Sequence, residues 1–355
     1  MRRIIRILGV LLAGAVASLV IVRAVWQRQT AHRIKIDSAT GISSLEKVRI
    51  GGIDQWISIR GWNREHPLLL LLHGGPGFPG MPFAHVTAEL EKHLVVVRWD
   101  QRGAGKSYSS SIPEHSMNID QFVADTAELT DLLRQRFNKP RILLGAHSWG
   151  TMIGALTVAK SPERFSAYLS VCQAANAAES ERLMYRGALE KATATGNDRA
   201  VSELTALGMP PYDEFRDYDR MTDWISRFSN AEHPPVSRGH FVRLALESPL
   251  YSWGDLVRIP LGAKFSFSQL WREAFYETDL FTQVPRIDVP VFFFLGRHDH
   301  TATASAALAE RYFAALEAPR GKQLIWFENS GHWPHLEEPA RFEQAVIEAA
   351  GAAWP

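Results

Sequence analysis

A serine lies in a short turn of mostly small residues between a predicted strand and a predicted helix. Residues 145–150 read Gly-Ala-His-Ser-Trp-Gly, after the apolar run 142–144 and before a helical stretch at 151–160. Such a turn holds a serine hydroxyl exposed above a sheet, where a nucleophile must stand. The usual pattern is Gly-x-Ser-x-Gly, and Ala146 replaces its first glycine. Because a serine here also suits a helix N-cap, the motif alone leaves both interpretations of Ser148 open.

A serine hydroxyl needs a histidine base, and the base needs an acid that orients it. Where a strand-to-helix turn carries the nucleophile, the acid and then the histidine follow in chain order. Asp299 directly follows the apolar run 291–295, and His332 follows the run 324–327. The preceding strand ends at Cys172 without a carboxylate. The order therefore predicts a catalytic triad of Ser148, Asp299 and His332.

Acyl transfer also needs two backbone N–H groups for the negative charge on the substrate oxygen. Residues 73–77, His-Gly-Gly-Pro-Gly, follow the apolar run 68–72. Pro76 has no N–H to donate, so Gly75 is the expected donor, partnered by the amide of Trp149. The alternative is a simple Gly-Pro loop, which the three ordered triad residues make less attractive.

These residues need strands that end at one edge of a sheet. Short continuous apolar runs are typical of strands buried on both faces of a mostly parallel sheet. Apolar residues at helical spacing in 120–137 and 341–350 predict helices that cover the sheet. Alternating residues at 48–50 and 57–60, around Gly51-Gly52, predict a hairpin at one sheet edge. The expected buried strands are residues 68–72, 94–97, 142–144, 165–172, 291–295 and 324–327.

The stretch 174–285 has helical periodicity and no buried-strand runs. It falls between two predicted strands, so we expect a helical cap over the carboxyl edge of the sheet. The predicted units are a membrane anchor or signal segment at 1–35, the first part of the core at 36–173, the cap at 174–285 and the second part of the core at 286–355.

The N-terminus has the pattern of a membrane segment. Arg2, Arg3 and Arg6 precede an apolar run at 7–22, which is just long enough to span the hydrocarbon if Arg23 reaches the interface. A cleaved signal peptide is the alternative, because residues 15–18 resemble a cleavage site. The apolar run continues beyond that site, so we expect an uncleaved anchor with the catalytic part outside the cytoplasm.

Charge and cysteine content exclude several classes of protein. The 39 Lys and Arg against 38 Asp and Glu give a net charge of +1, so there is no basic field for nucleic acid. The single cysteine, Cys172, can form neither an intramolecular disulfide nor a thiolate metal site. Successive side chains of the His298-Asp299-His300 run point in alternating directions, which argues against a metal site. We expect no metal and no cofactor.

Three motifs together resemble the proline iminopeptidase family of serine α/β-hydrolases. They are residues 73–77, residues 99–107 (Trp-Asp-Gln-Arg-Gly-Ala-Gly-Lys-Ser) and residues 147–150 (His-Ser-Trp-Gly). The resemblance implies an α/β-hydrolase fold, the triad Ser148, Asp299 and His332, and an oxyanion hole from the amides of Gly75 and Trp149. It also implies that residues 100–103 support the loops near the site without taking part in the chemistry.

The expected function is that of a serine hydrolase that works through an acyl-enzyme. The resemblance implies an aminopeptidase that removes an N-terminal residue from small peptides and holds the free amine with carboxylates, partly from the cap. Ala146 and the predicted anchor suggest a carboxylesterase or lactonase instead, and a non-catalytic binding protein is a third interpretation. The oligomeric state stays open. The cap acids include Glu179, Glu181, Glu190, Glu203, Asp223, Glu273 and Glu277.

Overall fold

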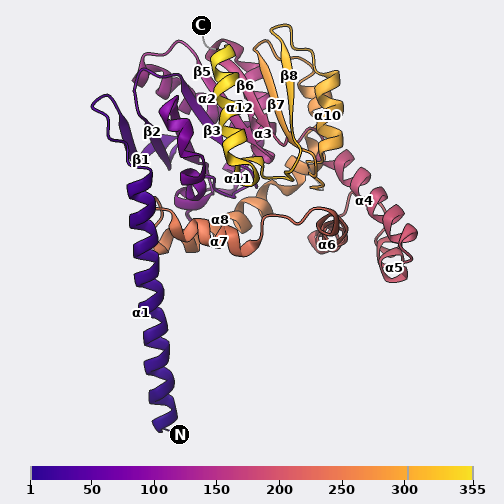
Figure 1. The fold of residues 1–355 in the computed structure, drawn as a ribbon. Coiled ribbons are helices and arrows are strands. Elements are labelled where there is room, and N and C mark those ends of the chain that lie inside the picture. Colours follow the sequence, from indigo (N-terminus) through magenta and orange to yellow (C-terminus); the bar gives the residue numbers. More distant parts are fainter. Residues whose placement is uncertain (1, 302–303, 354–355) are drawn as a thin grey trace.

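An eight-stranded sheet forms the centre of the computed structural model, which describes residues 2–301 and 304–353 (Figure 1). Its strand order is β1-β2-β4-β3-β5-β6-β7-β8. The first two strands and β4 pair antiparallel, and from β4 through β3 to β8 every pairing is parallel. The strands are β1 (Ile42–Ile50), β2 (Ile53–Gly61), β3 (Leu68–Leu72), β4 (Val95–Asp100), β5 (Ile142–His147), β6 (Phe165–Val171), β7 (Val291–Gly296) and β8 (Lys322–Phe327).

The predicted hairpin is confirmed at the sheet edge. Ile50 of β1 pairs with Ile53 of β2, and Gly51 and Gly52 form the two-residue turn between them. Both glycines have positive φ, of 53° and 76°. The turn that best matches the twist of two antiparallel strands requires positive φ at both central residues, which glycine adopts most easily.

Helices cover both faces of the sheet. One face packs on η1 (Met81–Lys92) and α12 (Pro339–Ala353), and the other on α2 (Ile119–Phe137), α3 (Trp149–Lys160) and α10 (Ala306–Ala315). Successive residues of β3 and β4 alternate between these two apolar clusters, because strand side chains alternate faces. Burial on both faces explains the continuous apolar runs of the inner strands, and these predicted strands are confirmed with shifts at their ends. The run 324–327 also forms a strand, but the prediction that it is buried on both faces is wrong, because β8 lies at the sheet edge and only Phe327 of it is buried.

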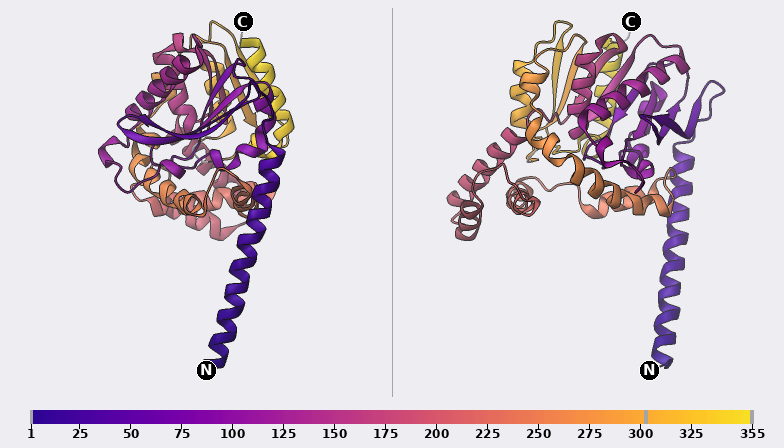
Figure 2. Two further views of the ribbon diagram at one scale, coloured as in Figure 1. Left: turned by 90° about the vertical axis from the view of Figure 1, so that its left-hand side faces the viewer. Right: turned by 180° about the vertical axis from the view of Figure 1, so that it is seen from behind.

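The connection from β6 to β7 is helical, as expected for residues 174–285. Figures 1 and 2 show its helices at the end of the molecule where the parallel strands finish. The boundaries of the four predicted units stay predictions. The helices are α4 (Ala177–Ala194), α5 (Asp198–Leu207), α6 (Phe215–Glu232), α7 (Arg238–Glu247), α8 (Trp253–Arg272), the π-helical turn η5 (Glu273–Glu277) and α9 (Leu280–Gln283).

Polar contacts join α8 to the segment after β4. Lys106 Nζ lies 2.6 Å from Asp255 Oδ2, and both side chains are buried. The hydroxyl of Tyr251 donates to Asp100, and the hydroxyl of Ser266 donates to the carbonyl of Gly103 at 3.1 Å. The motif at residues 99–107 therefore holds the cap on the core. It also contributes η2 (Gly105–Ser107), the first of three short turns with η3 (Glu114–Ser116) and η4 (Pro162–Arg164).

The N-terminal residues form one long helix, α1 (Arg2–Arg33), which projects from the rest of the molecule (Figure 2). In the described part of the chain, no helix combines the length and apolar character needed to cross a bilayer. The predicted membrane segment is thus not supported, although the side chains of 7–13 lie outside the described residues. The predicted orientation stays a prediction.

The end of α1, within the unit 1–35 predicted as an anchor or signal segment, contacts the cap. Arg23 is buried and its Nη2 donates to the carbonyl of Tyr251 at 2.6 Å. Gln27 Nε2 donates to the carbonyls of Ser248 and Tyr251 at 2.7 and 3.1 Å. These backbone acceptors lie in the loop before α8, so α1 is fixed to the cap.

The junction of cap and core predicts a pH-dependent stability. Burial raises the pKa of Asp100 to about 7, against hydrogen bonds from Tyr251 and the Lys106 amide that lower it. Between pH 4 and 7 the folded chain therefore holds a proton that the unfolded chain releases, so this carboxyl costs stability as the pH rises. We expect Asp100→Asn, which cannot ionise, to gain stability relative to the wild type between pH 4 and 8 in urea unfolding.

The matched control is Asp54→Asn, since the side chain of Asp54 is 56% exposed. It should follow the wild type at every pH. A constant difference between Asp100→Asn and the wild type across this range would show that Asp100 keeps an ordinary pKa.

Candidate active site

Ser148 stands in a strained turn between β5 and α3. Its φ of 55° and ψ of −127° fall where non-glycine residues are rare. The preceding residue ends β5, and the amide of Ser148 donates to the carbonyl of Val171 in β6 at 2.9 Å. A Cβ on Gly150 would lie 2.5 Å from the carbonyl oxygen of His73, so only glycine fits there. The predicted strand-turn-helix context of Ser148 is confirmed.

The structure explains the alanine that departs from the usual motif. Ala146 is buried, and its side chain lies towards α3 at Gly154. A Cβ on Gly154 would lie 3.1 Å from the Cβ of Ala146 and 2.8 Å from a ring carbon of Tyr168. The glycine in α3 therefore leaves the space that the extra methyl group occupies.

The three predicted triad residues meet at the carboxyl edge of the sheet. Ser148 Oγ lies 2.8 Å from His332 Nε2, and His332 Nδ1 lies 2.8 Å from Asp299 Oδ2. Asp299 follows β7, and His332 follows β8, just before the short helix α11 (Pro334–Glu337). With a proton on Nδ1, the imidazole donates to Asp299 and accepts from the serine hydroxyl, which is the arrangement a general base requires.

Asp299 remains ionised although it is buried. Burial alone would raise the pKa of Asp299, but the charge and hydrogen bond of His332 and the backbone N–H of Thr301 outweigh it, so the pKa is lowered. The Thr301 amide donates to Asp299 Oδ1 at 3.0 Å. A carboxylate with both oxygens engaged can hold the imidazole in one orientation.

Two residues that the sequence analysis did not single out hold the loop of His332. Glu337 Oε2 accepts from the amides of Gly331 and Trp333, each at 3.0 Å, on either side of the histidine. His147 Nε2 lies 2.8 Å from the carbonyl of His332. Burial and the neighbouring His335 and His332 hold the pKa of His147 well below its usual range, so the neutral ring donates this bond. The one sequence signal for Glu337 is its position, five residues after the predicted catalytic His332.

The glycine loop at residues 73–77 lies against the nucleophile. A Cβ on Gly74 would come within 3.0 Å of the Cβ of Ser148. Gly75 has a φ of 123°, and Trp149 is the first residue of α3, where backbone N–H groups lack intrahelical acceptors. His73 Nδ1 donates to the Gly74 carbonyl at 2.8 Å and its Nε2 accepts from the Gln101 amide at 3.1 Å. The glycine loop therefore lies against the serine turn, and the roles of the Gly75 and Trp149 amides as oxyanion donors stay predictions.

Two cavities flank the triad. One, of about 90 Å³, lies behind the glycine loop and is mainly apolar, lined among others by Phe78, Phe83 and Trp333. The other, of about 260 Å³, is lined by Asp299, His332 and Glu337 and by residues of the cap. The aromatic residues beside the first cavity come from residues 73–83, Phe241 and Trp333, which contact one another.

The seven cap acids named from the sequence do not line either cavity beside the triad. Several are engaged elsewhere: Glu203 accepts from Arg199 and Trp224, and Glu273 from the amide of Ile119. Glu181 is buried beside Tyr276, and burial raises its pKa to about 8. Among the described lining residues, the carboxylates of the two cavities are Asp299 and Glu337.

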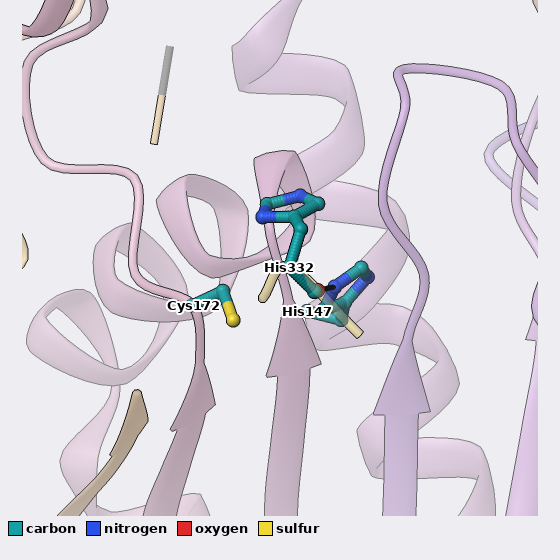
Figure 3. A group of neighbouring side chains, drawn as sticks. All are labelled: His147, Cys172 and His332. Carbon is teal, nitrogen blue, oxygen red and sulfur yellow. Dashed lines mark hydrogen bonds between the residues drawn. The ribbon is translucent and has the colours of Figure 1, made fainter. Parts of the chain in front are cut away.

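One group of donor atoms near the triad has metal-like spacing. Single ligand atoms of His147, Cys172 and His332 lie within 4.8 Å of one another (Figure 3). Both ring nitrogens of His332 already bond to the triad partners, and His147 Nε2 donates to a carbonyl. Burial raises the pKa of the Cys172 thiol well above its usual value, which disfavours the thiolate that binds metals. These residues therefore do not fit a metal site.

Comparison with known proteins places this geometry among hydrolases. Residues 67–339 match the family model of the alpha/beta hydrolase fold. Probable aminopeptidase YbaC of Bacillus subtilis is 34% identical over 323 residues, which are 88% of this chain and 97% of that protein. A proline iminopeptidase of Heyndrickxia coagulans is 25% identical over 288 residues, 77% of this chain and 87% of the relative.

A solved structure supports the same fold. The proline iminopeptidase-related protein of Thermus thermophilus has a TM-score of 0.62 at 19% identity, and the match covers 88% of this chain and 98% of that one. The order of the sheet and the serine turn between β5 and α3 agree with these matches, which cover most of the chain. The chain is therefore a hydrolase of the alpha/beta hydrolase fold family, and it is similar to a probable aminopeptidase and to proline iminopeptidases.

Proposed function

We propose that this hydrolase acts through a serine nucleophile and an acyl-enzyme, with Ser148, His332 and Asp299 as its triad. The observation that carries the proposal is the unbroken chain of hydrogen bonds from Ser148 through His332 to Asp299, with both distances 2.8 Å. Each of the three residues follows the end of a different strand. The fold therefore holds these two hydrogen bonds in place without the substrate.

In the proposed mechanism, His332 accepts the proton of Ser148 as its oxygen attacks the scissile carbonyl. Asp299 stabilises the imidazolium, and the amides of Gly75 and Trp149 bind the oxyanion. The imidazolium then protonates the leaving group, which leaves an acyl-enzyme on Ser148. Water activated by His332 releases the acid and restores the serine. Glu337 and His147 keep the histidine loop in position through these steps.

We propose that the substrate is a small peptide, from which the enzyme removes the N-terminal residue. The 34% identity to a protein named as a probable aminopeptidase, over 88% of this chain, supports this class. The carboxylates of Glu337 and Asp299 also give the larger cavity a negative charge that favours an ammonium group. A specific observation favours esters as the second class: the mainly apolar cavity behind the glycine loop reaches Ala146 and His147, which precede Ser148, and it has no carboxylate in its described lining, which suits a small acyl group.

Ser148→Ala should abolish turnover and labelling by a fluorophosphonate probe, because such probes react with an activated serine. Since the alanine removes one hydroxyl at the surface of the site, circular dichroism and the melting temperature should stay close to those of the wild type. Ser109→Ala, in an exposed loop, is the control and should keep both activity and labelling. Labelling that survives in Ser148→Ala would identify another nucleophile.

Asp299→Asn should lower kcat by about ten-thousandfold, the scale known for this change in serine proteases. An asparagine amide can donate to His332 Nδ1, which stabilises the tautomer with a proton on Nε2, and that nitrogen can no longer accept the serine proton. Asp288→Asn, at an exposed ion pair with Arg286, should keep kcat within about twofold of the wild type. If Asp299→Asn kept a kcat close to that of the wild type, another residue would be the acid of the triad.

The substrate class is tested with the full chain on L-proline p-nitroanilide, its N-acetylated form and short p-nitrophenyl esters, each against Ser148→Ala. We expect cleavage of the free amine form and loss of cleavage when the amine is acetylated, because the ammonium group is the recognised feature. Hydrolysis of the esters alone would retain the triad and reassign the protein as an esterase.

A further inference from the structure

A separate cavity lies where α1 meets the cap. It has a volume of about 500 Å³ and is lined by residues of α1, by Lys106 and by the start of α8. It shares no described lining residue with the two cavities beside the triad. The proposed hydrolase mechanism uses none of its residues.

The cavity contains a buried cation with an unused donor. Arg23 is only 3% exposed, and its Nε–H has no hydrogen-bond acceptor, whereas its Nη2 donates to the Tyr251 carbonyl. Its guanidinium carbon lies 4.2 Å from the ring centre of Trp253. A buried charged donor without a partner is costly, and an anion in the cavity would remove that cost.

The nearby carboxylate is committed to other groups. Asp255 Oδ2 lies 2.6 Å from Lys106 Nζ and accepts from Ser252, and Asp255 Oδ1 accepts from Arg258 at 3.2 Å. No carboxylate of the described residues lies within ion-pair distance of Arg23. Among the described lining residues, Arg23 and Lys106 thus carry two positive charges against the single charge of Asp255, so the cavity favours an anion.

An apolar path leads away from the cationic end. Val20 and Ala24 line the cavity from α1, and Val16 continues the same helix face one turn further out, because residues four apart in a helix share a face. Val16 and Val20 are 53% and 47% exposed, and Trp253 is 40% exposed. A ligand with an acidic head at Arg23 would therefore have an apolar surface along which a hydrocarbon chain can lie.

We propose that this cavity binds a single-chain amphiphile whose carboxylate or phosphate head accepts hydrogen bonds from Arg23 and whose hydrocarbon tail lies along Val20 and Val16. The Nε–H of Arg23 gains its missing acceptor, and Gln27 keeps α1 against the cap through the carbonyls of Ser248 and Tyr251. The site thus lies on the contact between α1 and the cap, so occupancy stabilises that contact.

The test is calorimetric titration of the full chain with the Ser148→Ala substitution, using dodecanoate and dodecyl phosphate below their critical micelle concentrations. We expect binding at one site by both. Arg23→Gln should weaken it about tenfold or more, the scale of a lost charged hydrogen bond. Arg28→Gln is the matched control, because Arg28 is an exposed arginine on the same helix, and it should bind as the parent does.

A second variant keeps the proposal testable if Arg23→Gln loosens α1. Ala24→Trp fills the cavity and leaves Arg23, Gln27 and their partners in place, so it should abolish binding with little change in melting temperature. Unchanged binding in Ala24→Trp, or equal losses in Arg23→Gln and Arg28→Gln, would overturn the proposal. Equal affinity for dodecanol would overturn the role of the acidic head, and equal affinity for inorganic phosphate would overturn that of the tail.

Vesicle flotation separates two sources of this head group. Retention on phosphatidylglycerol vesicles that is lost in both Arg23→Gln and Ala24→Trp would overturn the single-chain ligand and assign the site to a two-chain lipid of a bilayer. Binding of dodecanoate with no such retention would assign it to a free amphiphile. If neither vesicle retention nor binding of dodecanoate is observed, the proposed site is wrong.

Discussion

The imidazole of His332 bridges two residues that lie far away in the sequence, and this bridge depends on the parallel register of β5 to β8. Ala146 pairs with Ser170, Val171 with Phe294, and Gly296 with Phe327, so the loops after these strands open at one edge of the sheet. A slip of one residue in β7 or β8 would turn each strand's side chains to the opposite face and move Asp299 or His332 away from Ser148. The apolar clusters on both faces of the sheet prevent such a slip.

The cap depends on a polar junction with the core. Asp100 ends β4 and Lys106 follows it in the core, whereas Tyr251 lies in the loop before α8 and Asp255 in the first turn of α8. Because these groups are buried, each is stable only with its partner, so the junction fixes where α8 crosses the glycine loop. The loop before α8 also binds α1 through Arg23 and Gln27, so α1, the cap and the core meet there.

The sequence was informative wherever local chemistry and chain order suffice. Burial on both faces produces apolar runs, a two-glycine turn predicts a hairpin, and the order of serine, acid and histidine follows from the position of strand ends. The docking of α1 on the cap could not be predicted, because it depends on backbone carbonyls at Ser248 and Tyr251, which any residue would offer.

The residues that hold the His332 loop could not be predicted from the sequence for a similar reason. Glu337 holds backbone amides, and the partner of His147 is a carbonyl, so neither contact has a signature in residue types. The aromatic residues beside the triad were missed because Phe78 and Trp333 belong to loops without periodicity. The apolar N-terminal run predicts a bilayer span, which the described part of α1 does not support.

The pairing of Ala146 with Gly154 constrains how this family member can change. The methyl group of Ala146 occupies the space that a side chain on Gly154 would need, and Tyr168 closes the other side. An alanine at 154 would lie too close to the ring of Tyr168 whichever residue stands at 146, and the methyl group of Ala146 adds a second tight contact. Exchange of Ala146 for the usual glycine would therefore not free position 154, which stays restricted to glycine as long as Tyr168 remains in β6.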